Sequence, residues 1–407
     1  MSEVITVAAC AALICGLGIW ERFRLRRSLS RIPIRIHVNG TRGKSSVTRL
    51  IAAALREAGI RTIAKTTGTL PRLILPDGKE IPIERPGRAN VIEQRDIAHR
   101  AAAEEAEALV VECMALQPQL QSLCESKLVC ATHAVVTNCR ADHLDVMGPT
   151  EEDVAGALAN ITPANGKLFT AEQKHLRVLQ AAALDRKCEL NAVSSEEVEA
   201  VSDLEMAGFR YEEHKQNVAL ALRVCADLGI DRETALRGMY SAQPDPGAAT
   251  IHHIEFFGRS ITFFNAFAAN DPASSLQAWV QATSGFGAAA RRIVLVNCRS
   301  DRPDRSLQLA PAIADWPGVD HVVVTGSGTE VFQRAARKAG MDVAKLVAVG
   351  DTDLAELFEV IVELSAAEAV VVGVGNIGSR GLDIARHFRN RSRLHPSRTA
   401  ASQVHVP

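Results

Sequence analysis

The sequence is poor in aromatic residues, and it lacks both the cysteine spacing and the charge excess that mark several common classes of protein. Phe, Trp and Tyr make up 4% of the 407 residues, and the net charge is −1. A chain without a basic excess gives no general electrostatic case for binding nucleic acid. Its nine cysteines include no C-x-x-C pair. A zinc site is therefore not expected, and the odd number of thiols within apolar runs indicates reduced, buried cysteines.

An uncharged run near the N-terminus stands apart from the rest of the chain. It extends from Val4 to Trp20, and as a helix it would span roughly 25 Å, slightly under the bilayer core of about 30 Å. Arginines follow at positions 22, 24, 26, 27 and 31, while only Glu3 precedes the run. This asymmetry favours a single membrane-spanning helix with the rest of the chain in the cytoplasm. The alternative is a helix buried against a partner or a second copy of the chain.

Strand-like and helix-like segments alternate after residue 31. Short apolar runs next to turn residues predict buried strands, and apolar positions at helical spacing predict the helices between them. This alternation predicts an α/β fold, in which helices cover both faces of a mostly parallel sheet. The strands expected in this part are 32–39, 62–65, 108–113 and 133–138, the helices are 45–58, 91–106 and 117–126, and a hairpin is expected around Asp77 and Gly78.

The segment "QPDPGAAT" at 243–250 interrupts the alternation and is the expected linker. Beyond it, apolar runs alternate with helical stretches again, which predicts a second, smaller doubly wound unit. From about residue 387 the chain is basic and has no periodic apolar face. The expected parts are a membrane helix with a basic segment at 1–31, a central P-loop-type domain at 32–243, a Rossmann-like domain at 248–387 and a flexible tail at 388–407.

A glycine loop follows the first strand, but it lacks one glycine of the common phosphate-binding loop. That loop reads G-x-x-x-x-G-K-S/T, and the place of its first glycine is taken by Val38. The shorter form G-T-x-G-K-S still joins a buried strand to an amphipathic helix, where free N–H groups and the helix dipole favour an anion. Lys44 would reach the β- and γ-phosphates of ATP, and Ser45 would bind Mg²⁺. The expected nucleotide contacts are Gly40, Thr41, Arg42, Gly43, Lys44, Ser45 and Ser46.

Ionisable side chains follow two of the expected strands. Glu112 ends the apolar run in "LVVECMALQP", and a buried carboxylate is costly unless it is paired or bound to a metal. In "TNCRADHLDVMG", His143 stands among carboxylates, which suggests a second metal site with His143 as ligand, although such turns also cap helices. Carboxyl ends of strands in an open α/β sheet face the ligand crevice. The expected metal ligands are Ser45, Glu112 and His143, and the expected catalytic residues are Lys44, Glu112 and His143.

Polar residues elsewhere have two interpretations each. Asn217, near the start of a helix, either caps it or bonds an adenine edge. Asn265 and Asn270 follow a strand of the second unit and could bond base or ribose, and Arg302 could face phosphate or form a surface ion pair. The formal G-x-G-x-x-G at 373–378 is not expected to bind NAD, because too little chain follows for a further βαβ unit.

Taken in order, these motifs resemble the ATPase domain of the Mur ligase superfamily. The resemblance rests on G-T-x-G-K-S, "VVECMALQP", "AVVTNCRADHLDVMG" and "EHKQNVALAL", and "FNAFAANDPAS" is similar to the adenosine-contacting loop of that family's C-terminal domain. Within the superfamily the details resemble the ligase subunits of poly-γ-glutamate synthases, because a membrane segment stands where other members carry a UDP-sugar-binding domain. The resemblance covers residues 33 to 385.

The sequence departs from the superfamily pattern at two places. Many Mur ligases carry a carbamoylated lysine shortly after the Asp-His pair, whereas in this sequence the first lysine after His143 is Lys167. That role is therefore absent or taken by another group. Asn265 and Ala269 also replace the usual Asp and His of the C-terminal motif.

The resemblance implies an ATP-dependent amide ligase that uses Mg²⁺, or Mn²⁺ in its place. It would activate the terminal carboxylate of a poly-γ-glutamate chain as an acyl phosphate and join it to an incoming glutamate. Implied partners are the membrane, other membrane subunits of a synthesis and export complex, and further copies in an oligomer, but no nucleic acid. Arg72, Arg85 and Arg88 are candidates to grip the polyanion. The alternatives are a folate-type polyglutamylating ligase and a membrane-associated P-loop ATPase or kinase.

Overall fold

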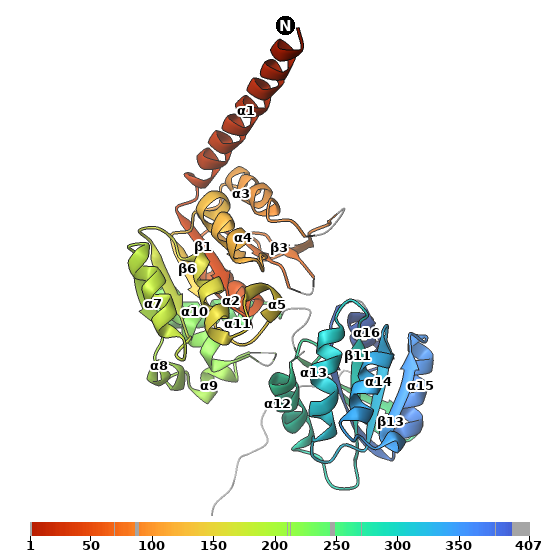
Figure 1. Cartoon of the computed structure of the whole chain (residues 1–407). Helices are drawn as coiled ribbons and strands as arrows, with labels where there is room; N and C mark the ends of the chain where they lie inside the picture. The colour runs from red at the N-terminus through yellow and green to blue at the C-terminus, as the bar shows by residue number, and fades with distance from the viewer. Residues whose placement is uncertain are drawn as a thin grey trace, which may run out of the picture. The chain divides into compact units, whose positions relative to one another are not determined.

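The computed structural model describes residues 2–68, 70–85, 89–209, 211, 213–244, 249–269, 271–378 and 380–392. The chain divides into two compact units, Met1–Asp245 and Pro246–Pro407, and each is described by itself (Figure 1).

The first unit is built on an eight-stranded sheet. Its strand order is β4-β3-β2-β5-β1-β6-β7-β8. Neighbours from β2 to β8 are parallel, and β3 and β4 are added antiparallel at one edge. The central strand β1 lies between β5 and β6, so their carboxyl ends meet at one edge. The strands are β1 (Ile34–Asn39), β2 (Thr62–Thr66), β3 (Arg72–Ile74), β4 (Glu80–Pro82), β5 (Ala108–Glu112), β6 (His133–Val136), β7 (Lys167–Thr170) and β8 (Glu189–Ala192).

Helices cover both faces of this sheet because its strands are apolar on both sides. Ile36 and Val38 of β1 join a core with α2, α10 and α11, while alternate residues of β5 face α3 on the other side. A further core on that second face includes α6 and α7. The helices are α2 (Lys44–Glu57), α3 (Glu93–Ala103), α4 (Pro118–Leu123), the π-helix η1 (Cys124–Val129), α5 (Leu144–Met147), α6 (Glu151–Leu158), the 3₁₀ helix η2 (Ala159–Ile161), α7 (Leu176–Asp185), α8 (Ser195–Glu199), α9 (Asp203–Met206), α10 (Lys215–Asp227) and α11 (Arg232–Ser241).

The N-terminal helix α1 (Ser2–Leu29) differs from all of these. It projects from the first unit and reaches it only at its C-terminal end, beside α3 (Figure 1). Leu25 and Leu29 are buried against α3, whereas apolar residues nearer the N-terminus, such as Ile5 and Ile19, are exposed. By length and composition α1 is the helix among the described residues that could cross a membrane.

The second unit contains a six-stranded sheet of order β13-β12-β11-β14-β10-β9, in which only the edge pair β10 and β9 is antiparallel. Helices α12, α13 and α14 pack on one face, and α15 and α16 on the other. The elements are β9 (Thr250–Phe256), β10 (Arg259–Asn265), α12 (Pro272–Thr283), β11 (Arg291–Cys298), α13 (Pro303–Ala314), β12 (His321–Gly326), α14 (Thr329–Lys338), the 3₁₀ helix η3 (Val343–Lys345), β13 (Leu346–Gly350), α15 (Leu354–Leu364), β14 (Glu368–Gly375) and α16 (Arg380–Arg391).

The α/β class and the mostly parallel sheets predicted from the sequence are confirmed. Three details differ from the predictions. The helix expected at 117–126 is α4 followed by η1, and the antiparallel strand β9 was not predicted. Helix α16 also continues past residue 387, where we expected the Rossmann-like domain to end, because Phe388 is buried against α15. Residues 393–407 of the expected tail lie outside the described residues.

Candidate active site

The glycine loop joins β1 to α2, and two of its positions require glycine. Gly40 and Gly43 have φ angles of 137° and 80°, which are unfavourable for residues that carry a Cβ. A Cβ on Gly40 would lie 1.9 Å from Thr137 Oγ1, and one on Gly43 would lie 2.7 Å from Asn217 Oδ1. The short loop is therefore a tightly packed turn, and α2 begins directly after it.

Side chains that follow β6 hold this loop in place. The Thr41 hydroxyl donates to Asn138 Oδ1 at 2.6 Å, and the Arg42 backbone N–H donates to the same oxygen at 3.1 Å. Thr137 donates to the Arg42 carbonyl at 2.5 Å. Sequence reasoning noted Asn138 only as the end of a strand and missed Thr137, because a contact across 95 residues leaves no local pattern.

Glu112 lies against the first turn of α2, as predicted from its position at the end of β5. Its side chain is buried, and β5 pairs with β1 so that Glu112 stands beside Val38. One carboxylate oxygen accepts from Ser45 Oγ at 2.9 Å and from the Thr67 backbone N–H at 2.7 Å. Glu112 therefore forms no ion pair with an arginine in the described contacts. A serine hydroxyl and a carboxylate at the start of a helix are oxygen ligands of the kind that Mg²⁺ prefers.

Lys44 covers the loop in this structure. Its ammonium group donates to the Gly40 carbonyl at 2.6 Å and lies 3.4 Å from the Thr41 carbonyl. Phosphate oxygens would offer the same cation stronger, charge-assisted hydrogen bonds. Lys44 therefore lies beside the loop whose amides would face an anion, and its contact with phosphate stays a prediction.

Asn217 approaches the loop from α10, together with an acid that the sequence did not suggest. Helix α10 begins at Lys215 with His214 as its N-cap, so Asn217 does not cap it. Its amide donates to Glu213 at 2.8 Å, and the His214 backbone N–H donates to the same carboxylate at 2.9 Å. Burial raises the pKa of Glu213 above its usual range. Asn217 and Glu213 therefore form a buried, hydrogen-bonded pair next to Gly43.

The remaining residues predicted for the site are characterised by their local surroundings. His143 has a φ of 48°, precedes α5 and lies 3.8 Å from an oxygen of Asp142. In the second unit, Asn265 is buried at the end of β10 and lies within 3.4 Å of Thr250 Oγ1, and Arg302 precedes α13. Asn270 falls outside the described residues. Among the described residues, no group of three or more His, Cys, Asp or Glu side chains could hold a metal ion.

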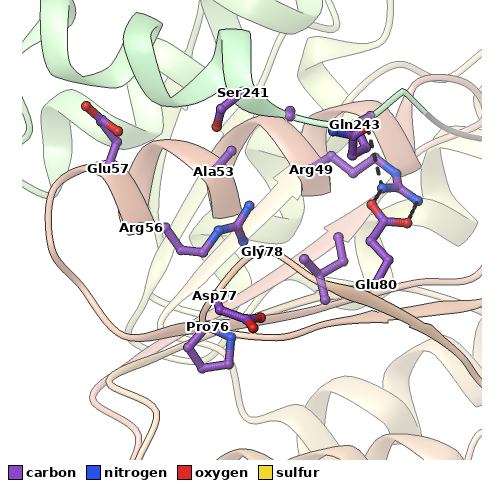
Figure 2. A pocket seen from close by; sticks show the side chains of 12 residues that line it. Arg49, Ala53, Arg56, Glu57, Pro76, Asp77, Gly78, Glu80, Ser241 and Gln243 are labelled. Atoms are coloured by element: carbon purple, nitrogen blue, oxygen red, sulfur yellow. Dashed lines mark hydrogen bonds and ion pairs between the residues drawn. The ribbon is translucent and has the colours of Figure 1, made fainter.

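Two of the three arginines expected to grip a polyanion are described. Arg85 donates to Glu93 at 2.7 Å, and Arg72 begins β3, whereas Arg88 lies outside the described residues. A separate hollow of about 360 Å³ is lined by α2, by the β3–β4 hairpin and by the end of α11; here Arg49 pairs with Glu80 and Arg56 points toward Asp77 (Figure 2). No residue of the glycine loop lines it.

Comparison with known proteins identifies the family. Residues 38–243 match the Mur ligase middle domain, and residues 251–391 match the poly-gamma-glutamate synthase CapB C-terminal domain. The capsule biosynthesis protein CapB of Bacillus anthracis is 36% identical over 376 residues, covering 92% of this chain and 80% of that protein. The chain belongs to the CapB family. PGA synthase CapB of Bacillus subtilis (strain 168) is 34% identical over 373 residues, covering 91% and 94%.

The fold also matches solved structures of proteins less similar in sequence than the CapB relatives. Mycobacterium tuberculosis folylpolyglutamate synthase complexed with ADP superposes with a TM-score of 0.67 at 19% identity, covering 92% of this chain and 95% of that one. At this identity the similarity establishes the fold alone. It confirms the fold that the motifs of the glycine loop and of β5 predicted.

This CapB-family chain lacks the carbamoylated lysine found in many Mur ligases, and the structure shows where two of its other lysines lie. Lys167 stands at the amino end of β7 and pairs with Asp227 at 2.6 Å. That end of the parallel sheet is opposite to the edge that holds Glu112, so Lys167 does not replace the missing group. A different lysine, Lys65, is fully buried near the carboxyl end of β2 and pairs with Glu93 at 2.7 Å. Burial lowers the pKa of Lys65.

Proposed function

We propose that the protein is an ATP-dependent ligase that lengthens a poly-γ-glutamate chain. The observation that carries this proposal is the contact between Ser45 and Glu112 at the start of α2, directly after the glycine loop. Membership of the CapB family and the two matching domain models support it. The proposal explains why a nucleotide loop, a buried carboxylate and an apolar N-terminal helix occur in one chain.

The proposed reaction has two balanced steps. The terminal carboxylate of the polymer attacks the γ-phosphorus of ATP, and ADP leaves as an acyl phosphate forms. The amine of the incoming glutamate then attacks the acyl carbon, the amide bond forms, and inorganic phosphate leaves with one former carboxylate oxygen. The loop amides and Lys44 hold the triphosphate in line for the first step, so their contribution is positioning and neutralisation of charge.

Mg²⁺ fits the residues at the start of α2. Ser45 and Glu112 would hold it with phosphate oxygens and water, and His143 is assigned to a second ion; Mn²⁺ accepts the same ligands. When bound, the metal neutralises charge on the transferring phosphoryl group. The hydrogen bond from Ser45 to Glu112 at 2.9 Å supports this pairing of the two ligands.

We assign the ATPase role to residues 32–243 and the ligase role to residues 248–387. Asn265, Asn270 and Arg302 are proposed to contact the nucleotide from the second domain. An acyl phosphate is destroyed by water, so a ligase of this type gains from closing its site during the reaction. Arg72, Arg85 and Arg88 are proposed to contact the polymer.

We assign α1 to the cytoplasmic membrane, with both units in the cytoplasm. Its length and apolar composition support this location. A growing polyglutamate that must leave the cell would be made beside its export apparatus, so other membrane subunits and further copies of the chain are the proposed partners.

The full-length chain in detergent or vesicles tests this function. ADP release should require glutamate and a glutamyl acceptor and should yield polymer. Glu112→Ala removes the carboxylate that supports Ser45, and we expect the rate to fall by about 100-fold or more, in the range observed for groups that act directly on the transition state. Turnover that needs no glutamate and survives Glu112→Ala would instead identify a simple ATPase.

A further inference from the structure

A pocket of about 390 Å³ lies where α1 meets the body of the first unit. Gly18, Arg22 and Arg26 line it from α1, and Ile92, Lys127 and Leu128 line it from the segments that precede α3 and end η1. These α1 residues recur at spacings of four, so they share one face of the helix. The pocket is thus bounded by two separate parts of the unit rather than by the helix alone.

The pocket carries an excess of positive charge. Its lining contains four cations, Arg22, Arg26, Arg95 and Lys127, and one carboxylate, Glu21. Arg95 is paired with Glu21 and Asp96. For the other three, no hydrogen bond or ion pair of the side chain is found within the described part of the chain. Three cations near one pocket repel each other and favour an anionic ligand.

The same lining is apolar between the cations. Leu25 and Ile92 both line the pocket; Leu25 is buried, and Ile92 is 46% exposed to solvent. Leu128 and Cys130 add further apolar surface. A small hydrophilic anion would leave this surface unused, whereas a ligand with a phosphate and a hydrocarbon chain satisfies both parts of the lining.

The position of the pocket along α1 matches the membrane surface. The uncharged run ends at Trp20, and the pocket extends from Gly18 to Arg26. Eight residues of helix rise about 12 Å, which is enough to cross the headgroup layer outside a hydrocarbon core of about 30 Å. Arg24, on another face of the helix, stacks over Trp20 at 5.6 Å, and a Trp with a cation at this level is typical of the interface.

We propose that this pocket binds one anionic phospholipid of the cytoplasmic leaflet. Arg22, Arg26 and Lys127 contact its phosphate, and an acyl chain lies against Leu25 and Ile92. The lipid thereby bridges the membrane helix and the catalytic unit. This inference rests on the proposed membrane location of α1, but not on the ligase reaction.

The test compares two double variants of the full-length chain. Arg22→Gln with Arg26→Gln removes two cations of the pocket, and the control, Arg24→Gln with Arg27→Gln, removes two cations from the same helix that do not line it. Both variants change the charge of the helix equally. Native mass spectrometry from detergent, with phosphatidylglycerol or phosphatidylcholine added, measures the lipid retained by each protein.

We expect the wild type and the control to retain one phosphatidylglycerol in preference to phosphatidylcholine. The pocket variant should bind it about tenfold or more weakly, because two of the cations that face the anionic headgroup are removed. Lys127→Gln, on the catalytic unit, should weaken binding in the same direction. The site would be overturned if both double variants lost phosphatidylglycerol binding equally. It would also be overturned if the wild type retained phosphatidylglycerol and phosphatidylcholine equally. Failure of the wild type to float with vesicles would instead overturn the membrane location of α1.

Discussion

At the residue scale, Gly43 is a position where the loop has little room. Its φ of 80° disfavours a side chain, and Asn217 Oδ1 would lie 2.7 Å from an added Cβ. We expect Gly43→Ala to displace Asn217 or the loop and to weaken ATP binding by about tenfold, because strain of this kind costs on the order of 1–3 kcal/mol. Calorimetric titration with a non-hydrolysable ATP analogue measures the effect.

Gly59 supplies a matched control at the end of α2. It has the same φ of 80°, but an added Cβ there meets nothing within 4 Å. Gly59→Ala should therefore cost about 1 kcal/mol of stability through backbone strain and leave ATP binding unchanged. If both variants bound the analogue as tightly as the wild type, the packing of Asn217 on the loop would have no part in nucleotide binding.

Prediction from the sequence succeeded for residues that end a run of apolar positions. Glu112 was expected at the end of a buried strand, and it ends β5 and accepts a hydrogen bond from Ser45; its role as a metal ligand stays a prediction. Glu213 and Thr137 were missed, since their contacts with Asn217 and Arg42 depend on how α10 and β6 pack against the loop. The buried ion pair of Lys65 with Glu93 was also missed, because the sequence around Lys65 shows only one polar residue within a strand.

At the element scale, β1 and η1 are joined by a buried charged pair. His37 Nδ1 lies 2.8 Å from Glu125 Oε2, and both side chains are almost fully buried. Burial lowers the pKa of His37, but hydrogen bonds with Cys113 and Glu125 outweigh it and raise the pKa to about 9. Breaking such a buried pair costs about 3–5 kcal/mol. We expect Glu125→Gln to lower the melting temperature markedly at pH 6.

The pH dependence of this loss follows from the raised pKa. The folded value of about 9 exceeds the usual 6.5, so the stabilisation is complete below pH 6.5 and is lost as pH rises through 9. The difference between wild type and Glu125→Gln should therefore shrink over that window in thermal melts. Glu205→Gln is the control, because the hydrogen bond from Arg232 lowers the pKa of Glu205 to about 2. If the difference in melting temperature between the wild type and Glu125→Gln stayed constant from pH 6 to pH 9.5, it would contradict a charged His37.

Strands were predicted more securely than the irregular elements. The apolar runs expected after the linker include 293–297 and 369–373, which are rich in β-branched residues, and β11 and β14 contain them. The π-helix η1 was read as ordinary helix, because the shift in hydrogen bonding leaves side-chain periodicity almost unchanged over one turn. Strand β9, with alternating burial at a sheet edge, carries too weak an apolar pattern to identify.

At the scale of the whole molecule, the fold was predictable because strand order in an α/β chain follows from a few rules. Alternating strands and helices require parallel pairing with right-handed crossovers, which leaves few topologies. The antiparallel edges β3–β4 and β9–β10 depart from that pattern. Of these two, only the hairpin with Asp77 and Gly78 at its turn could be predicted, since an Asp-Gly pair is a common turn signal and Gly78 indeed has a φ of 81°.

The transfer of a carboxylate oxygen to phosphate tests the central claim most directly. The full-length protein is given ATP, glutamate and a glutamyl oligomer, with oxygen-18 in the carboxylates of both the glutamate and the oligomer, and the inorganic phosphate released is analysed by mass spectrometry. Activation as an acyl phosphate predicts that each amide bond formed delivers one labelled oxygen to phosphate. Unlabelled phosphate released alongside polymer would contradict the proposed mechanism.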